Sequence, residues 1–181
     1  MNHNCCTKPI KTKGINGEID MFIVWIIIIT VGILAVAIYF GTKTKPINKI
    51  TDSSEVSMTV DANTYDWGII DYDGGIVSKN FSIKNTSETT LQLYNIKTSC
   101  MCTTAQIKTS EVTSRKFGMH EKTTDVIEVK PGETANLLVV FDPAFHGPSG
   151  IGPITRTVTM NTNSTKDSVL TFNLTGTVVK K

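Results

Sequence analysis

The segment Val77-Ser-Lys-Asn-Phe-Ser-Ile83 decides the fold class, because its residues alternate in character. Val77, Lys79, Phe81 and Ile83 fall on one face of an extended chain, and the polar residues between them fall on the other. The turn signal Asp73-Gly74-Gly75 precedes the segment. The same period of two recurs in three later segments, 135–142, 154–161 and 170–175. These patterns predict strands that bury one face each.

The region 56–181 contains no amphipathic helical period and is rich in Thr and Val, residues that favour strands. Seven or eight short strands in roughly 125 residues are typical of a two-sheet sandwich. We therefore predict an all-β, immunoglobulin-like sandwich over residues 56–181.

A long apolar segment precedes this region. Met21 to Phe40 carries no charged residue, and at about 1.5 Å per residue such a helix crosses a hydrocarbon core about 30 Å thick. Trp25 and Tyr39 lie near its two ends, where interfacial aromatic residues are favoured. We predict a disordered tail over 1–20, a transmembrane anchor over 21–41 and a polar linker over 42–55.

Cleavage of the segment is the alternative, since Ala35-Val36-Ala37 resembles a signal-peptidase site. The apolar run continues past this site, which favours an uncleaved anchor. Three lysines on each side of the helix give no charge bias for its orientation. A short tail before the anchor and a long domain after it indicate a single-pass protein of the cell membrane with its C-terminal domain outside the cytoplasm.

Charge excludes one class of partner. Residues 1–50 carry a net charge of +4 and residues 51–181 a net charge of −2, so the predicted domain lacks the basic face of a nucleic-acid-binding protein. The chain also lacks the phosphate-binding glycine loop, the His-Glu-x-x-His motif and the Gly-x-Ser-x-Gly motif. We predict a domain without catalytic activity of its own.

Cys100 and Cys102 are the chemically distinctive residues of the domain. If the segment is a strand, residues two apart point to the same face and present two thiols side by side. Their Cα atoms would then lie near the upper limit for a disulfide, so a disulfide between them is not expected. Two thiolates with His120 and His146, from two long loops, suit tetrahedral Zn, and exchanging one imidazole for Met119 would favour Cu. We predict a soft-metal site with these five residues as candidate ligands.

Two alternatives remain open. In the first, the cysteines are small buried strand residues, and the domain is a metal-free scaffold that binds an unidentified envelope protein through an exposed strand edge. In the second, Cys100 and Cys102 form a thiol-redox module.

Five short elements carry a family resemblance: Asp66-Trp-Gly-Ile-Ile70, Cys100-x-Cys102-Thr103, Lys130-Pro-Gly-Glu133, Val140-Phe-Asp-Pro143 and Leu174-Thr-Gly-Thr-Val178. Together they resemble the domain of unknown function 1573, over residues 56–181. The resemblance implies an immunoglobulin-like sandwich in an envelope-associated bacterial protein. It implies no activity, because the family has no settled one.

Overall fold

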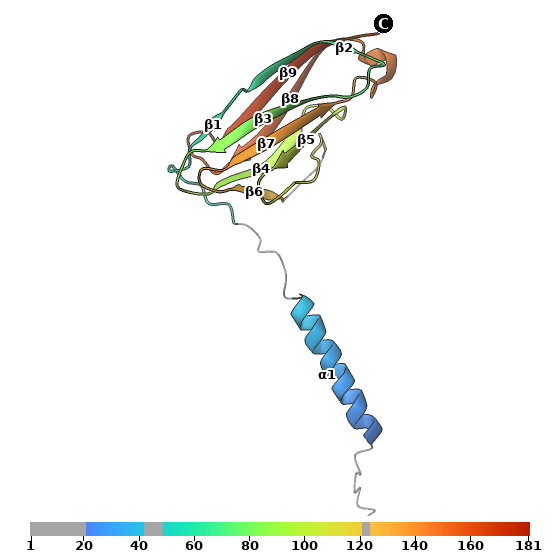
Figure 1. Ribbon diagram of the computed structural model, residues 1–181, viewed down its shortest axis with the longest axis vertical. Coiled ribbons are helices and arrows are strands. Elements are labelled where there is room, and N and C mark those ends of the chain that lie inside the picture. The colour runs from blue at the N-terminus through green and yellow to red at the C-terminus, as the bar shows by residue number, and fades with distance from the viewer. Residues whose placement is uncertain (1–20, 42–48, 121–123) are drawn as a thin grey trace, which may run out of the picture. The chain divides into compact units, whose positions relative to one another are not determined.

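The computed structural model describes three stretches of the chain, residues 21–41, 49–120 and 124–181. The chain forms two compact units, Met1–Ile47 and Asn48–Lys181. The predicted tail 1–20 and part of the predicted linker, 42–48, lie outside the described residues. Figure 1 labels the helix of the first unit and the strands of the second.

The first unit contains a single described helix, α1 (Met21–Gly41). It is long and apolar enough to cross a membrane, and none of the side chains from Met21 to Tyr39 is buried. Thr30 is a polar residue within this apolar helix, and its hydroxyl donates to the carbonyl oxygens of Ile26 and Ile27, both at 2.9 Å. The predicted helix is confirmed. Membrane anchors and signal sequences share this character.

The described part of the second unit consists of strands and one 3-10 turn. Its elements are β1 (Met58–Val60), β2 (Thr64–Asp71), β3 (Val77–Asn85), β4 (Leu91–Thr98), β5 (Thr103–Lys108), β6 (Val126–Val129), β7 (Thr134–Phe141), η1 (Gly147–Gly150), β8 (Gly152–Thr162) and β9 (Val169–Val179).

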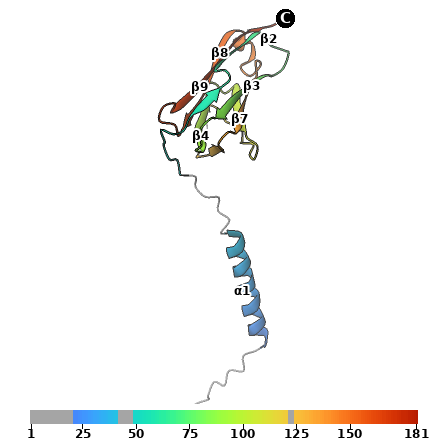
Figure 2. The same ribbon diagram turned by 60° about the vertical axis from the view of Figure 1, so that its left-hand side comes forward.

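The strands form two sheets, one in the order β1-β3-β7-β5 and the other in the order β2-β9-β8-β4-β6. β2 pairs with β9 in parallel, whereas the other pairs are antiparallel. In the turned view, β8 and β9 lie on one side of the domain and β3 and β7 on the other (Figure 2). The predicted two-sheet, immunoglobulin-like sandwich is confirmed.

The inner faces of the sheets form the core, as the alternation predicted. Phe81 and Phe172, one from each sheet, are buried with their ring centroids 4.9 Å apart. The main cluster spans Val56 to Leu174, so the domain supplies its own core. A smaller cluster of five buried residues also forms: Ile70, Cys102, Phe141, Ile154 and Val178.

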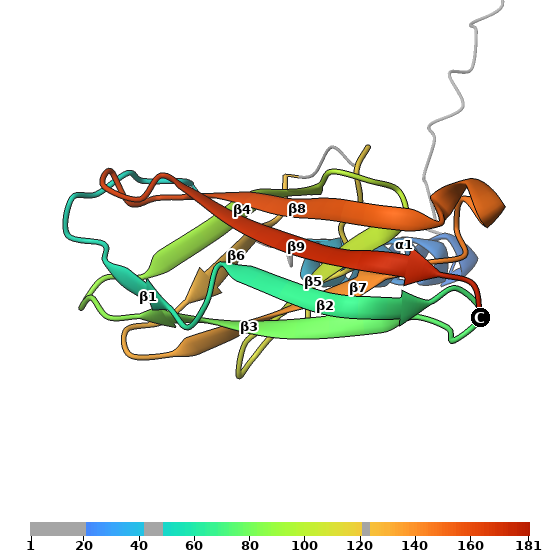
Figure 3. The ribbon, with the colours of Figure 1, turned by 90° about the horizontal axis from the view of Figure 1, so that it is seen from above.

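This smaller cluster lies at one end of the sandwich. Thr103, at the start of β5, pairs with Phe141, at the end of β7, and Gly152, at the start of β8, pairs with Val178 near the end of β9. The chain enters the domain at the other end, where Ser53 bridges Ser164 in the β8–β9 turn. Figure 3 shows this turn at the far end from the C-terminus. The connections β4–β5 and β7–β8 therefore meet at the end remote from where the chain enters.

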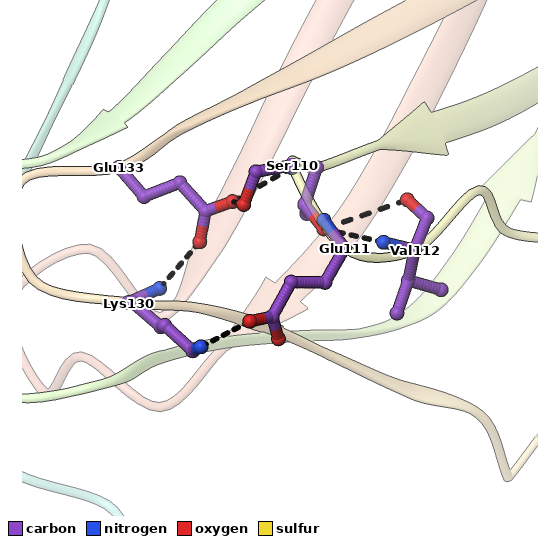
Figure 4. A network of polar contacts seen from close by, with 6 residues as sticks. Ser110, Glu111, Val112, Lys130 and Glu133 are labelled. Atoms are coloured by element: carbon purple, nitrogen blue, oxygen red, sulfur yellow. Dashed lines mark hydrogen bonds and ion pairs between the residues drawn. The ribbon is translucent and has the colours of Figure 1, made fainter.

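Glu133, in the turn between β6 and β7, links this turn to the β5–β6 connection (Figure 4). One of its carboxylate oxygens accepts hydrogen bonds from the backbone N–H of Ser110, at 2.8 Å, and from the Ser110 hydroxyl. The other oxygen accepts one from the backbone N–H of Lys130 at 3.0 Å. These hydrogen bonds lower the pKa of Glu133. The bond from the Ser110 hydroxyl has the largest effect, and the two bonds from backbone N–H groups add to it. The Lys130 ammonium pairs with Glu111 beside it.

We expect the Glu133 contacts to make domain stability depend on pH. Because the folded pKa is lowered, the stabilisation is present above the ordinary glutamate pKa of about 4.3 and is lost as pH falls through the folded pKa. The Glu133→Gln variant should be less stable than the parent at neutral pH and lose less stability on acidification. Urea unfolding between neutral and acidic pH checks this, with exposed Glu88→Gln as the control. Parallel curves for parent and Glu133→Gln would contradict it.

Candidate functional site

The two cysteines lie in the connection that carries the chain from β4 in one sheet to β5 in the other. The connection is a turn in which the backbone N–H of Thr103 donates to the carbonyl oxygen of Cys100 at 3.2 Å. The hydroxyl of buried Thr98 stabilises the turn by donating to the carbonyl oxygens of Cys100 and Thr103, both at 3.0 Å. The prediction that Cys100 and Cys102 share one strand face is therefore wrong.

Cys100 and Cys102 form a disulfide, which corrects the prediction that they would not. The physical reason is the turn. It brings the two Cα atoms to 5.3 Å, inside the range of about 4.4–6.8 Å that a disulfide needs, whereas an extended chain would hold them at its upper limit.

The two cysteines differ in exposure. Cys102 is only 4% exposed and belongs to the small apolar cluster with Phe141. Cys100 is half-buried at the edge of that cluster, and Met101 between them is 55% exposed. Solvent therefore reaches the disulfide from the Cys100 side.

His146 approaches the accessible side from the β7–β8 connection. Its Nε2 lies 3.2 Å from the Cys100 sulfur. Two hydrogen bonds fix the connection. The backbone N–H of Asp142 donates to the carbonyl oxygen of Cys102 at 3.0 Å, and the Ser149 side-chain hydroxyl donates to the carbonyl oxygen of His146 at 2.7 Å. Gly147, with φ of 61°, then turns the chain into η1. The loop is tied to the cysteine turn, which places the imidazole beside the sulfur.

Arg156 approaches the buried side from β8. Its Nε donates to the Cys102 sulfur at 3.1 Å, and its guanidinium lies 5.3 Å from the centroid of the Phe141 ring. Burial lowers the pKa of Arg156. Among the described residues it forms no ion pair with a carboxylate. The site thus holds a partly desolvated positive charge against one sulfur.

Sequence reasoning missed Arg156, although a signal was present. Arg156 occupies the same strand face as Ile154, Val158 and Met160, all of which are buried. An arginine on an otherwise apolar strand face needs a partner, because burying its charge alone is costly. Here that partner is a cysteine sulfur.

The structure brings together three of the five predicted metal ligands. The ligand atoms of Cys100, Cys102 and His146 all lie within 4.8 Å of one another. His120, which ends the described part of the β5–β6 connection, is exposed and is not a member of this group. Met119 beside it is also exposed. Phe117 is buried and bridged to Ala105 in β5, and the carbonyl oxygen of Gly118 accepts a hydrogen bond from the backbone N–H of Thr98 at 3.4 Å, so the connection passes the end of β4 while both predicted side chains stay exposed.

Comparison with known proteins confirms the resemblance over part of the predicted range, and it confirms the fold. The model of the family described as "Protein of unknown function (DUF1573)" matches residues 58–119. No curated protein matches the chain. A protein of unknown function from Porphyromonas gingivalis W83 is similar in structure, with a TM-score of 0.52 and 18% identity over 72% of this chain and 51% of that one. This chain therefore spans about half the length of that protein.

Two further solved structures are similar to a lesser degree. The PapD-like domain 7 of human CEP192 gives a TM-score of 0.46 and 12% identity, over 76% of this chain and 94% of that one. The E. coli chaperone DraB gives a TM-score of 0.39 and 7% identity, over 69% of this chain and 55% of that one.

Proposed function

We propose that the chain is a membrane-anchored thiol–disulfide redox module whose working group is the Cys100–Cys102 pair. One observation carries the proposal: a disulfide lies in an accessible turn, with an imidazole nitrogen 3.2 Å from its accessible sulfur. When the disulfide opens, a histidine at that distance can hydrogen-bond the Cys100 thiol, and a proton can pass between the imidazole and the Cys100 sulfur.

The short spacing of the two cysteines argues against a purely structural disulfide. Its stabilising effect through the unfolded chain grows with the length of the loop that it closes. A loop of about three residues gives about 1.6 kcal/mol on that relation, against about 3 kcal/mol for a 15-residue loop. A domain with a large core of its own gains little from such a bond, whereas a redox group needs the two sulfurs close together.

In the proposed topology α1 is an uncleaved anchor in the cell membrane, residues 42–55 are a tether, and the sandwich lies outside the cytoplasm. A disulfide supports this side, because disulfides persist in oxidising compartments and are rare in the cytosol. Within the domain, the cysteine turn lies at the end opposite to where the chain enters. That end is accessible to a partner protein carrying thiols.

Redox titration of the full chain in detergent micelles tests the proposal, with Cys5→Ser and Cys6→Ser removing the other cysteines. We expect the Cys100–Cys102 pair to interconvert reversibly between disulfide and dithiol across glutathione buffers while the domain stays folded. Alkylation followed by mass measurement reads the thiols, and resistance to proteolysis reads the fold. A pair that opens only after unfolding in urea would identify the disulfide as structural.

Metal binding by the reduced pair is the second candidate function, because the three ligand atoms of Cys100, Cys102 and His146 already lie close together. Arg156 favours a singly charged ion: two thiolates and a monocation carry a net charge of −1, which the guanidinium at the Cys102 sulfur balances, whereas two thiolates and a dication are already neutral. Cu⁺ therefore suits the site better than Zn²⁺. Elemental analysis of the reduced, metal-loaded chain, with His146→Ala for comparison, distinguishes this function.

A further inference from the structure

We propose that the two sulfurs have fixed roles: an incoming thiolate attacks Cys100, and Cys102 departs as the thiolate held by Arg156. This inference rests on the proposed redox function and deepens it, because it states where the substrate becomes bonded and which residue promotes bond cleavage. Arg156 contacts the reacting sulfur, so it counts as a catalytic residue.

Access decides which sulfur is attacked. Thiol–disulfide exchange requires the incoming sulfur to approach along the line of the S–S bond, on the side opposite to the leaving sulfur. Cys102 is packed in the apolar cluster with Phe141 and cannot be approached in this way. Cys100 is half-buried, with exposed Met101 on one side and exposed His146 on the other.

Charge decides which sulfur leaves. The Arg156 Nε lies 3.1 Å from the Cys102 sulfur, and the guanidinium has no carboxylate partner among the described residues. The Thr103 hydroxyl lies 3.6 Å from the same sulfur and can donate a second hydrogen bond. In the disulfide this positive charge faces a neutral sulfur. When Cys102 becomes a thiolate, the contact becomes a charge-assisted hydrogen bond, which is roughly twice as strong as a neutral one.

The step balances without another reagent. The electron pair of the incoming thiolate forms a bond to the Cys100 sulfur, the Cys100–Cys102 bond breaks, and its electron pair passes to the Cys102 sulfur. The incoming sulfur is oxidised and Cys102 is reduced. If the partner carries a second thiol, its thiolate attacks the mixed disulfide, and Cys100 leaves beside His146, which can supply a proton. The products are a partner disulfide and a dithiol in this chain.

Adduct mapping tests the site of attack. The oxidised full chain, with Cys5→Ser and Cys6→Ser, is mixed with reduced glutathione, quenched in acid and alkylated. Cleavage after Lys97 and Lys108 releases one peptide, residues 98–108, which contains both cysteines. We expect tandem mass spectrometry to place glutathione on Cys100 and the alkyl group on Cys102. Adducts on Cys102, or divided equally, would overturn the assignment.

Substitution of Arg156 tests the leaving group. Losing a charge-assisted contact should slow opening by glutathione about tenfold in Arg156→Gln, whereas Arg156→Lys should stay within about threefold of the parent. Arg115→Gln removes the chain's other arginine, which pairs with Asp125, and should not change the rate.

The outcomes separate the two proposals. An unchanged rate in Arg156→Gln, or equal slowing in the Gln and Lys variants, overturns the role of Arg156 and leaves the redox function standing. A disulfide that glutathione cannot open in the folded chain overturns both. If an Arg156 variant folds poorly, adduct mapping still tests the proposal, because that experiment uses the chain with Arg156 intact.

Discussion

Cys100→Ala should abolish oxidation of a dithiol by this chain. In the assay, a synthetic peptide with two cysteines is mixed with the oxidised chain, and formation of the peptide disulfide is followed by mass measurement. The parent disulfide is the oxidant, so removing either of its sulfurs should reduce the rate to that of the peptide alone. We expect this loss for Cys100→Ala and for Cys102→Ala.

In the Cys5→Ser, Cys6→Ser background, the two variants should nevertheless differ in the reactivity of the one cysteine that remains. Cys100 is accessible beside His146, whereas Cys102 is 4% exposed. With an aromatic disulfide reagent, Cys102→Ala should form a mixed disulfide more than roughly tenfold faster than Cys100→Ala, since thiol reactivity follows access as well as ionisation. Equal rates would contradict the assigned geometry. Continued peptide oxidation by either variant would contradict the redox proposal itself.

Phe141→Ala should be the most destabilising substitution near the site. Phe141 is 2% exposed, stacks on Trp67 at 5.6 Å between ring centroids, and lies beneath the Arg156 guanidinium. Removing a buried phenyl ring costs about 3–5 kcal/mol, because the transfer free energy is lost and a cavity remains. This is a large part of the roughly 5–15 kcal/mol that stabilises an ordinary domain.

The matched control is Phe145→Ala, four residues further along the chain. Phe145 is 48% exposed, so its truncation should change the free energy of unfolding by less than about 0.5 kcal/mol. Pulse proteolysis of the full chain in increasing urea measures both. A loss below about 1 kcal/mol for Phe141→Ala would show that the small cluster does not support the site.

The elements of regular period could be predicted from sequence, and those without one could not. The uncharged run from Met21 to Phe40 predicts a long apolar helix, and the alternation around Phe81 predicts a strand with one buried face. The family elements pointed to the same sandwich. Each of these signals is repeated over many residues, so single exceptions such as Lys79 do not obscure it.

The site depends on single positions, for which the sequence has weaker signals. The cysteine turn contains neither glycine nor proline, so Ser99 was the one weak turn signal in Ser99-Cys-Met-Cys102 at the end of β4. His120 and His146 both lie in long loops without a regular period, and only the tertiary structure shows which imidazole reaches the cysteine sulfurs. Arg156 gave a signal through its apolar neighbours, but its partner sulfur lies 54 residues away in the chain.

The reaction of the oxidised full chain with the two-cysteine peptide tests the central claim most directly, when the thiols of both products are counted. We predict one peptide disulfide formed for each chain, with two new thiols that map to residues 98–108 and a domain that remains folded. A peptide that stays reduced beside an intact Cys100–Cys102 disulfide would contradict the claim.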